Sequence, residues 1–178
     1  MALALGGNVE GTIAGETSPV ERTLIWALWQ LQASLGDLRS ASLYRSRAVS
    51  LPGSPIAQPD FLNTAAIART DLPPDAVLAL AKALELAAGR RRGARFGPRP
   101  LDIDLLLYDD RRSGLPELTL PHPRLRERRF VLAPLAEIAP DLAVPPDGAR
   151  VADLLARLGE PGDAGIADDV ERIGWGRS

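Results

Sequence analysis

The sequence predicts an α+β fold in which helices pack on a mostly antiparallel sheet, and three observations support this prediction. Two stretches carry apolar residues at helical spacing, and each begins near a proline and ends at a glycine. Short runs typical of strands lie before, between and after these stretches. The order along the chain is therefore strand, helix, strand, strand, helix, strand, followed by a helical C-terminal extension. That order matches a ferredoxin-like βαββαβ sandwich.

The first half of this order lies within residues 1–67. A short buried strand is expected at Leu3–Leu5, before a glycine-bearing segment. Ser18 is expected to cap a helix that begins at Pro19 and ends at Gly36. Two further strands, which we expect to pair as neighbours in the sheet, follow at residues 38–44 and 61–67.

The second half begins with a helix that opens at Pro73 and ends at Gly89. A strong strand follows at residues 101–108. Helical patterns then occupy the ranges 130–138 and 151–158. The tail, residues 159–178, is weakly specified. Since no repeat or linker divides the chain, we expect one domain over residues 1–158 followed by this tail.

Composition narrows the class of protein. The chain has 178 residues, of which 46% are hydrophobic and 25% charged, as in ordinary globular proteins. The absence of cysteine excludes disulfides and thiolate metal sites. The net charge of −2 argues against a general nucleic-acid binder, and no run reaches the ~18 apolar residues of a membrane span. We expect a cytoplasmic protein with no membrane or nucleic-acid partner; the oligomeric state stays open, with a monomer favoured.

Two carboxylates on one strand are the first candidate for chemistry. Side chains alternate along a strand, so Asp102 and Asp104 should share one face, while Leu101, Ile103 and Leu105 point into the core. Two acids roughly 7 Å apart repel each other unless a cation lies beside them. Oxygen ligands of this kind suit Mg²⁺. The alternative is a strand edge with two acids in solvent.

Cations gather in the sequence just before these acids. Five arginines lie within ten residues, ending at Arg99. Arginines beside metal-binding carboxylates suit a phosphate-bearing substrate, and no P-loop is present. The single histidine, His122, is held between two prolines and cannot belong to a multi-histidine metal site. Taken alone, these residues could also be solvated surface groups.

Together these motifs resemble a known family. The resemblance is carried by Gly97-Pro98-Arg99, Leu101-Asp102-Ile103-Asp104-Leu105-Leu106, Pro121-His122-Pro123-Arg124 and the segment 127–135, with Leu5-Gly6-Gly7-Asn8, Leu43-Tyr44-Arg45-Ser46 and the segment 58–63 upstream. The chain is similar, from about Leu3 to Leu158, to the 6-hydroxymethyl-7,8-dihydropterin pyrophosphokinases of folate biosynthesis. Residues 159–178 are not covered.

The resemblance implies an enzyme that moves pyrophosphate from ATP to the hydroxymethyl group of the pterin and releases AMP. It implies two Mg²⁺ ions held by Asp102 and Asp104, with Asp102 near the attacking hydroxyl as proton acceptor. The implied catalytic residues are Asp102, Asp104, Arg90 and Arg99. Those for ATP are Glu85, Arg92, Leu105, Thr119, His122 and Arg128, and those for the pterin are Phe61, Asn63, Asp102 and Phe130.

The chain departs from the family in a few places. Gly7 stands where serine is frequent, and we expect that difference to matter little. Glu117 stands where some members have an arginine that reaches ATP, so that contact is missing or comes from another arginine. The segment 46–57 is long, so its pterin contacts are not assigned. Two other classes stay open: a ferredoxin-like ligand-binding module, and a metal-dependent nucleotidyl transferase, which would release pyrophosphate.

Overall fold

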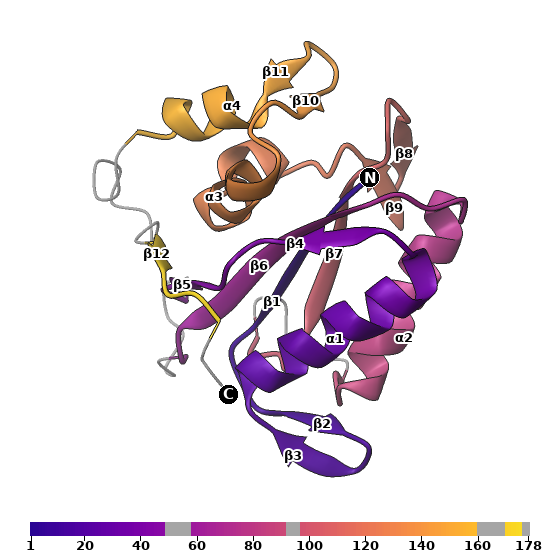
Figure 1. The fold of residues 1–178 in the computed structure, drawn as a ribbon, viewed down its shortest axis with the longest axis vertical. Coiled ribbons are helices and arrows are strands. Elements are labelled where there is room, and N and C mark those ends of the chain that lie inside the picture. The colour runs from indigo at the N-terminus through magenta and orange to yellow at the C-terminus, as the bar shows by residue number, and fades with distance from the viewer. Residues whose placement is uncertain (49–57, 92–96, 160–169, 176–178) are drawn as a thin grey trace.

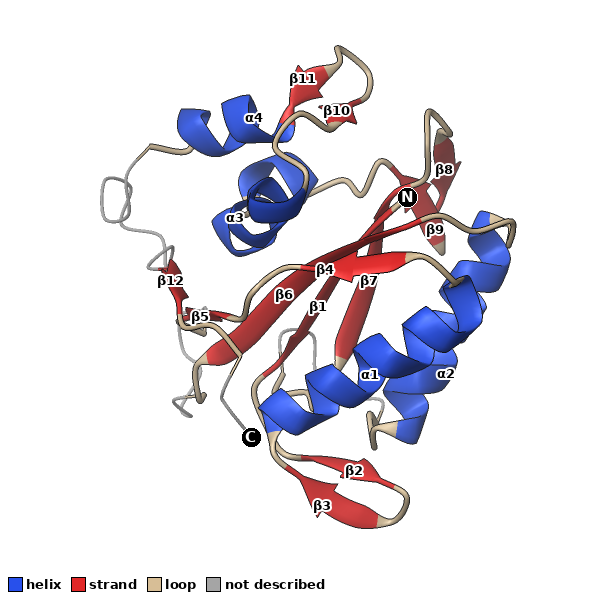
Figure 2. Cartoon of the chain, in the orientation of Figure 1, coloured by secondary structure: helices blue, strands red, loops and turns tan. Residues whose placement is uncertain are grey.

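A six-stranded antiparallel sheet forms the centre of the molecule (Figures 1 and 2). The computed structural model describes residues 1–48, 58–91, 97–159 and 170–175. Five strands follow the order β12-β5-β6-β1-β7, and β4 also pairs with β6. Their bounds are β1 Ala2–Gly7, β4 Leu38–Ser40, β5 Tyr44–Ser46, β6 Phe61–Ala68, β7 Asp102–Leu107 and β12 Val170–Arg172.

Helices cover both faces of this sheet (Figure 1). On one face lie α1 (Val20–Leu35) and α2 (Pro74–Ala87), and on the other lie α3 (Arg129–Ile138) and α4 (Val151–Arg157). The short 3₁₀ helix η1 (Leu125–Glu127) precedes α3. The elements β1, α1, β4 with β5, β6, α2 and β7 form the expected ferredoxin-like βαββαβ unit, which confirms the fold class. No helix in the described ranges is both long and apolar enough to cross a membrane.

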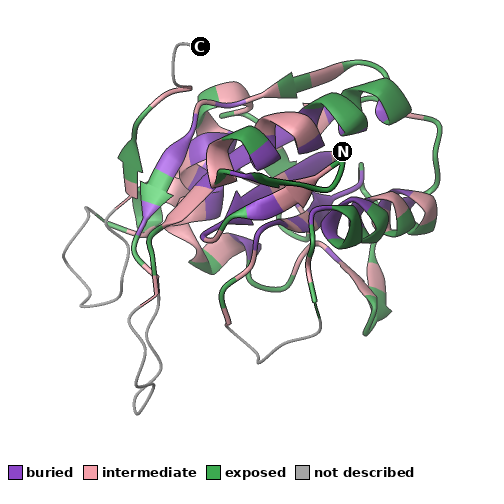
Figure 3. Ribbon diagram, turned by 90° about the horizontal axis from the view of Figure 1, so that it is seen from below, coloured by how far each residue is buried: buried purple, intermediate pink, exposed green. Residues whose placement is uncertain are grey.

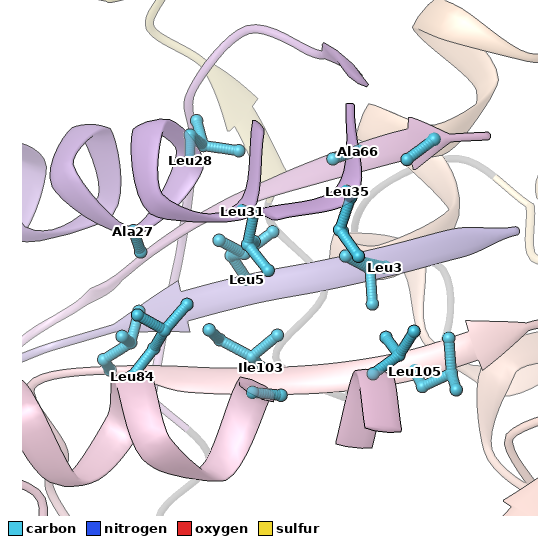
Figure 4. Packing of buried hydrophobic residues seen from close by; sticks show 14 of the residues in the cluster. Leu3, Leu5, Ala27, Leu28, Leu31, Leu35, Ala66, Leu84, Ile103 and Leu105 are labelled. Atoms are coloured by element: carbon cyan, nitrogen blue, oxygen red, sulfur yellow. The ribbon is translucent and has the colours of Figure 1, made fainter. Parts of the chain in front are cut away.

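The sheet separates two apolar cores. Leu3 and Leu5 of β1 and Ile103 and Leu105 of β7 pack against α1 and α2 (Figure 4). Leu106, on the opposite face of β7, packs in the core beneath α3. Burying each such leucine contributes about 1.5–3 kcal/mol. Buried residues accordingly concentrate in the strands and on the inward faces of the helices (Figure 3). The alternation predicted for β7 is therefore confirmed.

Several local expectations were wrong. Ser18 ends β3 (Glu16–Ser18), which forms a hairpin with β2 (Gly11–Ile13), and Pro19 takes the N-cap position of α1 without any side-chain cap. The strand expected at residues 38–44 is two strands, β4 and β5, because one extra residue between Ser40 and Tyr44 interrupts the regular pairing with β6, although the Ala41 amide still donates to the Ala65 carbonyl. Two more hairpins were missed: β8 (Ser113–Leu115) with β9 (Leu118–Leu120), and β10 (Ala143–Val144) with β11 (Ala149–Arg150).

The C-terminal tail contributes a strand to the sheet. Residues of β12 pair with β5 in antiparallel register, with Val170 opposite Ser46 and Arg172 opposite Tyr44. This strand was not predicted, since three residues are too short to show an alternating pattern. The tail therefore closes the β5 edge of the sheet.

Candidate active site

A cavity of about 340 Å³ lies where the sheet meets the start of α3. Its floor comes from neighbouring strands, and Gly6 and Ala4 of β1 lie opposite Asp102 and Asp104 of β7. These small residues leave room above the floor beside the two carboxylates. The walls are formed by Ser46, Phe61, Asn63, Arg99, Arg124, Arg128, Phe130 and Val131, among others. The structure thus brings together most of the residues that the sequence singled out.

Asp102 is held by two arginines. Nη1 of Arg90 lies 2.5 Å from Oδ1 of Asp102, and Nη1 of Arg99 lies 2.8 Å from Oδ2. Burial alone would raise the pKa of Asp102, but the two guanidinium groups outweigh it and hold the pKa below its ordinary value. Asp102 is therefore a fully ionised, charge-balanced carboxylate.

Asp104 lies in a different electrostatic environment. Its Oδ2 is 3.6 Å from Nη1 of Arg128 and 3.8 Å from Nε2 of His122, both longer than a hydrogen bond. Burial, followed by the charge of Asp102, raises the pKa of Asp104 despite these partners. Burial also lowers the pKa of His122, so the imidazole supplies little positive charge near neutral pH. Of the two carboxylates, Asp104 is the one whose charge is less well balanced.

Glu85 links α2 to this charge cluster. Its side chain is 3% exposed, and its Oε1 accepts a hydrogen bond of 2.8 Å from the Ile103 amide and lies 2.6 Å from Nη1 of Arg90. Lys82 donates to Glu85 Oε2 at 3.1 Å. A second cavity of about 1100 Å³ opens here and is lined by Lys82, Glu85, Arg90, Arg91 and Arg99 among others. The chain of ion pairs Lys82–Glu85–Arg90–Asp102–Arg99 thus connects the two cavities.

Asn8 fixes the backbone of Arg99, a role that sequence reasoning missed. The backbone amide of Asn8 donates to the Arg99 carbonyl, and the backbone amide of Arg99 donates to the side-chain Oδ1 of Asn8, both at 2.9 Å. Nδ2 of Asn8 donates to Gln58 Oε1 and to the Pro59 carbonyl at 3.2 Å. Asn8 is 3% exposed. Its place at the end of the Leu5-Gly6-Gly7-Asn8 motif was the available signal.

Gly7 lies close to the backbone of Pro100. A Cβ at Gly7 would overlap the carbonyl oxygen of Pro100 and lie 3.2 Å from Cγ1 of Val20. The neighbouring backbone of Arg99 and Pro100 would have to move, and that backbone leads directly into β7. A serine at this position would therefore require a shift of the Pro100 backbone in this chain, and the expectation that the difference from the family matters little stays a prediction.

We expect Gly7→Ser to destabilise the protein by about 1–3 kcal/mol, the usual cost of overpacking. Turnover should fall as well, because the displaced segment carries Arg99. Chemical denaturation and steady-state assays would measure both effects. Gly114→Ser is the matched control, since a Cβ at Gly114 would meet no atom within 4 Å. Equal stability of the two variants would contradict this reading of Gly7.

The opposite wall of the cavity is aromatic and amide-bearing. Phe61 opens β6 and Phe130 lies in the first turn of α3, and both rings are half-buried. Asn63 is 5% exposed and its Nδ2 donates to Ser46 Oγ at 2.9 Å. The guanidinium carbon of Arg128 lies 5.5 Å from the centre of the Phe130 ring. Two flat rings and an oriented carboxamide can receive a flat heterocycle with polar edges.

Two of the expected ATP residues lie away from the cavity, and a third lies outside the described residues. Leu105 is buried in the core under α1 and α2, so its side chain does not face the cavity. Thr119 lies in β9, where its Oγ1 donates to the Leu115 carbonyl at 3.0 Å, away from the cavity lining. Arg92 lies outside the described residues. The roles given to these three residues stay predictions.

The two carboxylates of the cavity, Asp102 and Asp104, are suitable ligands for Mg²⁺. No group of three or more histidine or acidic side chains placed to hold a metal occurs in the described ranges. Mg²⁺, however, is commonly held by one or two carboxylates, with water and substrate phosphates completing its shell. Asp102 and Asp104 face the same cavity and can supply those carboxylates. Because two arginines occupy Asp102 in this arrangement, metal binding requires that they find other partners.

Comparison with known proteins agrees with this geometry. Residues 2–140 match the family model of 7,8-dihydro-6-hydroxymethylpterin-pyrophosphokinase. A 2-amino-4-hydroxy-6-hydroxymethyldihydropteridine pyrophosphokinase of Synechocystis sp. is 39% identical over 158 residues, which cover 88% of this chain and 74% of the relative. A protein of the same name from Pseudomonas aeruginosa is 42% identical over 132 residues, 71% of this chain and 81% of the relative.

Solved structures support the fold. A chain of Plasmodium falciparum HPPK-DHPS superposes with a TM-score of 0.66 over 97% of this chain, at 14% identity. This chain covers only 46% of that longer protein, so the similarity concerns one part of it. The family match over most of the chain, and the relatives at 39% and 42% identity, show that the chain belongs to the 7,8-dihydro-6-hydroxymethylpterin-pyrophosphokinase family.

Proposed function

We propose that this enzyme transfers the pyrophosphate group of ATP to the hydroxymethyl group of 6-hydroxymethyl-7,8-dihydropterin in folate biosynthesis. The hydroxyl oxygen attacks the β-phosphorus and passes its proton to the Asp102 carboxylate, the bond from that phosphorus to the oxygen bridging to AMP breaks, and AMP leaves with that oxygen. The observation that carries this proposal is a cavity with two carboxylates and several arginines on one side and two aromatic rings on the other. A phosphate chain and a flat heterocycle can meet there.

The arginines are proposed to exchange partners when ATP enters. In the ligand-free arrangement, Arg90 and Arg99 neutralise Asp102. Phosphate oxygens are also good partners for guanidinium groups, so both arginines can turn to ATP. Asp102 and Asp104 are then the residues that would hold two Mg²⁺ ions. When bound, Mg²⁺ supplies positive charge against the charge that develops on the transferred group.

Phe61, Asn63 and Phe130 are proposed to hold the pterin. The rings can stack on the heterocycle, while the Asn63 carboxamide bonds its polar edge. Because Nδ2 of Asn63 already donates to Ser46, the orientation of the carboxamide is fixed before any ligand arrives. Glu85, His122 and Arg128 are proposed to contribute to the ATP side, Glu85 by positioning Arg90. We further propose a cytoplasmic monomer that acts on small molecules rather than on nucleic acid or membranes.

Incubation with ATP, Mg²⁺ and the reduced pterin alcohol tests the reaction. AMP and the pterin pyrophosphate should form together in equal amounts. Release of inorganic pyrophosphate instead would favour a nucleotidyl transferase. Ligand binding without any turnover would favour a binding module. Omitting the pterin is the control, since AMP formed without it would indicate simple hydrolysis.

The two aromatic residues give a further prediction. Phe61→Ala and Phe130→Ala should each weaken pterin binding about fivefold or more, because a stacking surface is lost. ATP affinity should change little. Both rings are half-buried, so the loss of stability should stay well below the ~3–5 kcal/mol of a buried Phe→Ala change.

Thermal melts and separate titrations of each ligand measure these effects. Leu132→Ala is the contrasting variant, since Leu132 is fully buried on the same helix as Phe130. It should lose stability and leave pterin affinity nearly intact in the folded fraction. A Phe130→Ala protein that behaves like Leu132→Ala would remove Phe130 from the site.

A further inference from the structure

The C-terminal strand β12 lies next to the pterin side of the cavity. It pairs with β5, and β5 pairs with β6. Ser46 is the last residue of β5 and lies opposite both Val170 of β12 and Phe61 of β6. Ser46 is 4% exposed, lines the cavity and accepts the Asn63 hydrogen bond. The strand β5, which positions Ser46, has only three residues, and β12 pairs along its outer edge.

One carboxylate ties this edge to α3. Glu137 of α3 accepts hydrogen bonds from Ser42 Oγ at 2.7 Å, Tyr44 Oη at 2.8 Å and Arg172 Nη2 at 3.2 Å. Arg172 Nη2 also donates to Ser42 Oγ at 2.7 Å. Burial, then the bond to Glu137, raises the pKa of Tyr44 to about 12, so its hydroxyl stays a donor. Glu137 thus joins α3, the chain before β5, β5 itself and β12.

Three further hydrogen bonds hold residues 173–175 against the chain before β5. The amides of Ile173 and Gly174 donate to the Leu43 carbonyl at 2.9 and 3.2 Å. Nε1 of Trp175 donates to the Ala41 carbonyl at 3.0 Å, and its ring packs against the core under α1. Residues 170–175 therefore pair with or hydrogen-bond to the chain all the way from Ala41 to Ser46. This segment lies beyond the residues that match the family model, 2–140.

We propose that residues 170–175 are a positioning element for pterin binding, and that Arg172 acts through Glu137 and β5 on Ser46 and Asn63. In the described part of the chain, the Arg172 side chain hydrogen-bonds to Ser42 and Glu137, neither of which lines the cavity, so Arg172 is a positioning residue. The aromatic wall depends on the same contact, because Phe130 lies in the first turn of the helix that carries Glu137. The proposal rests on the function proposed above, since it names which substrate the tail serves.

Arg172→Met tests this in the full chain. Removing one exposed, hydrogen-bonded ion pair should raise the pterin Kd and KM about three- to fivefold, while the Kd of a non-transferable ATP analogue stays within about twofold. Arg172→Lys should recover part of the loss, because an ammonium can still reach Glu137. Arg150→Met is the matched control: Arg150 also forms ion pairs, with Asp141 and Asp153, and is similarly exposed, but it lies before α4, away from the cavity.

Calorimetric titration of each ligand, with Mg²⁺ present, separates the outcomes. A chain ending at residue 169 should show a larger loss of pterin affinity in its folded fraction, measured alongside a thermal melt. Unchanged pterin affinity in both Arg172→Met and the shortened chain would overturn the positioning role while leaving the reaction intact. So would an equal loss of pterin and ATP affinity. If the unaltered chain bound no pterin and formed no AMP, both the proposed function and this inference would fall.

Discussion

Asp104→Ala is expected to lower turnover by at least about a hundred- to thousandfold, since a carboxylate proposed to hold Mg²⁺ beside the reacting phosphates is lost. The protein should remain folded and should gain slightly in stability at neutral pH. Burial and the nearby Asp102 raise the pKa of Asp104, which means that its ionised form is disfavoured in the folded state.

The direction of the pKa shift of Asp104 determines how this gain in stability depends on pH. A carboxyl whose pKa is raised on folding destabilises the protein only above its ordinary pKa, where the unfolded chain is ionised. The stability advantage of Asp104→Ala should therefore shrink as the pH falls from the raised pKa of Asp104 toward the ordinary pKa of aspartate, and should be absent below it. Asp153→Ala, at an exposed ion pair on α4, is the control for activity. Near-normal turnover by Asp104→Ala would remove this residue from the metal site.

Arg99→Ala should cause the second large loss of turnover, about a hundredfold, because an oriented, charged donor near the phosphates disappears. The backbone at this position is fixed by Asn8, so the guanidinium starts from a defined place. Arg99→Lys should recover only part of the loss, since an ammonium cannot present two parallel donors.

Measuring kcat and KM for both substrates shows where the loss of Arg99 acts. The effect should fall on kcat and on ATP, with little change in pterin affinity. Arg150→Ala provides a comparison with an arginine whose ion pairs lie outside the cavity. Full rescue by lysine would mean that charge alone matters at residue 99, and the argument from the planar guanidinium would be wrong.

The sequence predicted the parts of the site that depend on regular geometry. The two-residue period of a strand placed Asp102 and Asp104 together and turned Ile103 away from them, as the structure confirms. The fold class followed from element order in the same way. Which charges pair could not be predicted, because Glu85, Arg90 and Asp102 meet only through the packing of α2 on β7.

The remaining surprises share one physical cause. A three-residue strand such as β12 is held by its neighbour and by Glu137, so its sequence carries no visible pattern. Glycine is required at residue 7 because the Pro100 backbone comes close to it, and no local sequence pattern predicts this approach. In both features a decisive contact joins distant segments, since Gly7 meets the Pro100 backbone and β12 pairs with β5.

The central position of β1 in the sheet has a consequence for how the protein folds. Leu5 of β1 lies opposite Thr64 on one side and Ile103 on the other, so β1 completes its pairing only with partners made some sixty and a hundred residues later. Such distant pairings fold slowly, because the intervening chain must be closed first. During synthesis one edge of β1 therefore stays unpaired until β7 has emerged. The arrival of β7 both completes the pairing of β1 and brings the two aspartates to the cavity, so the acidic side of the site forms only when this distant pairing is made.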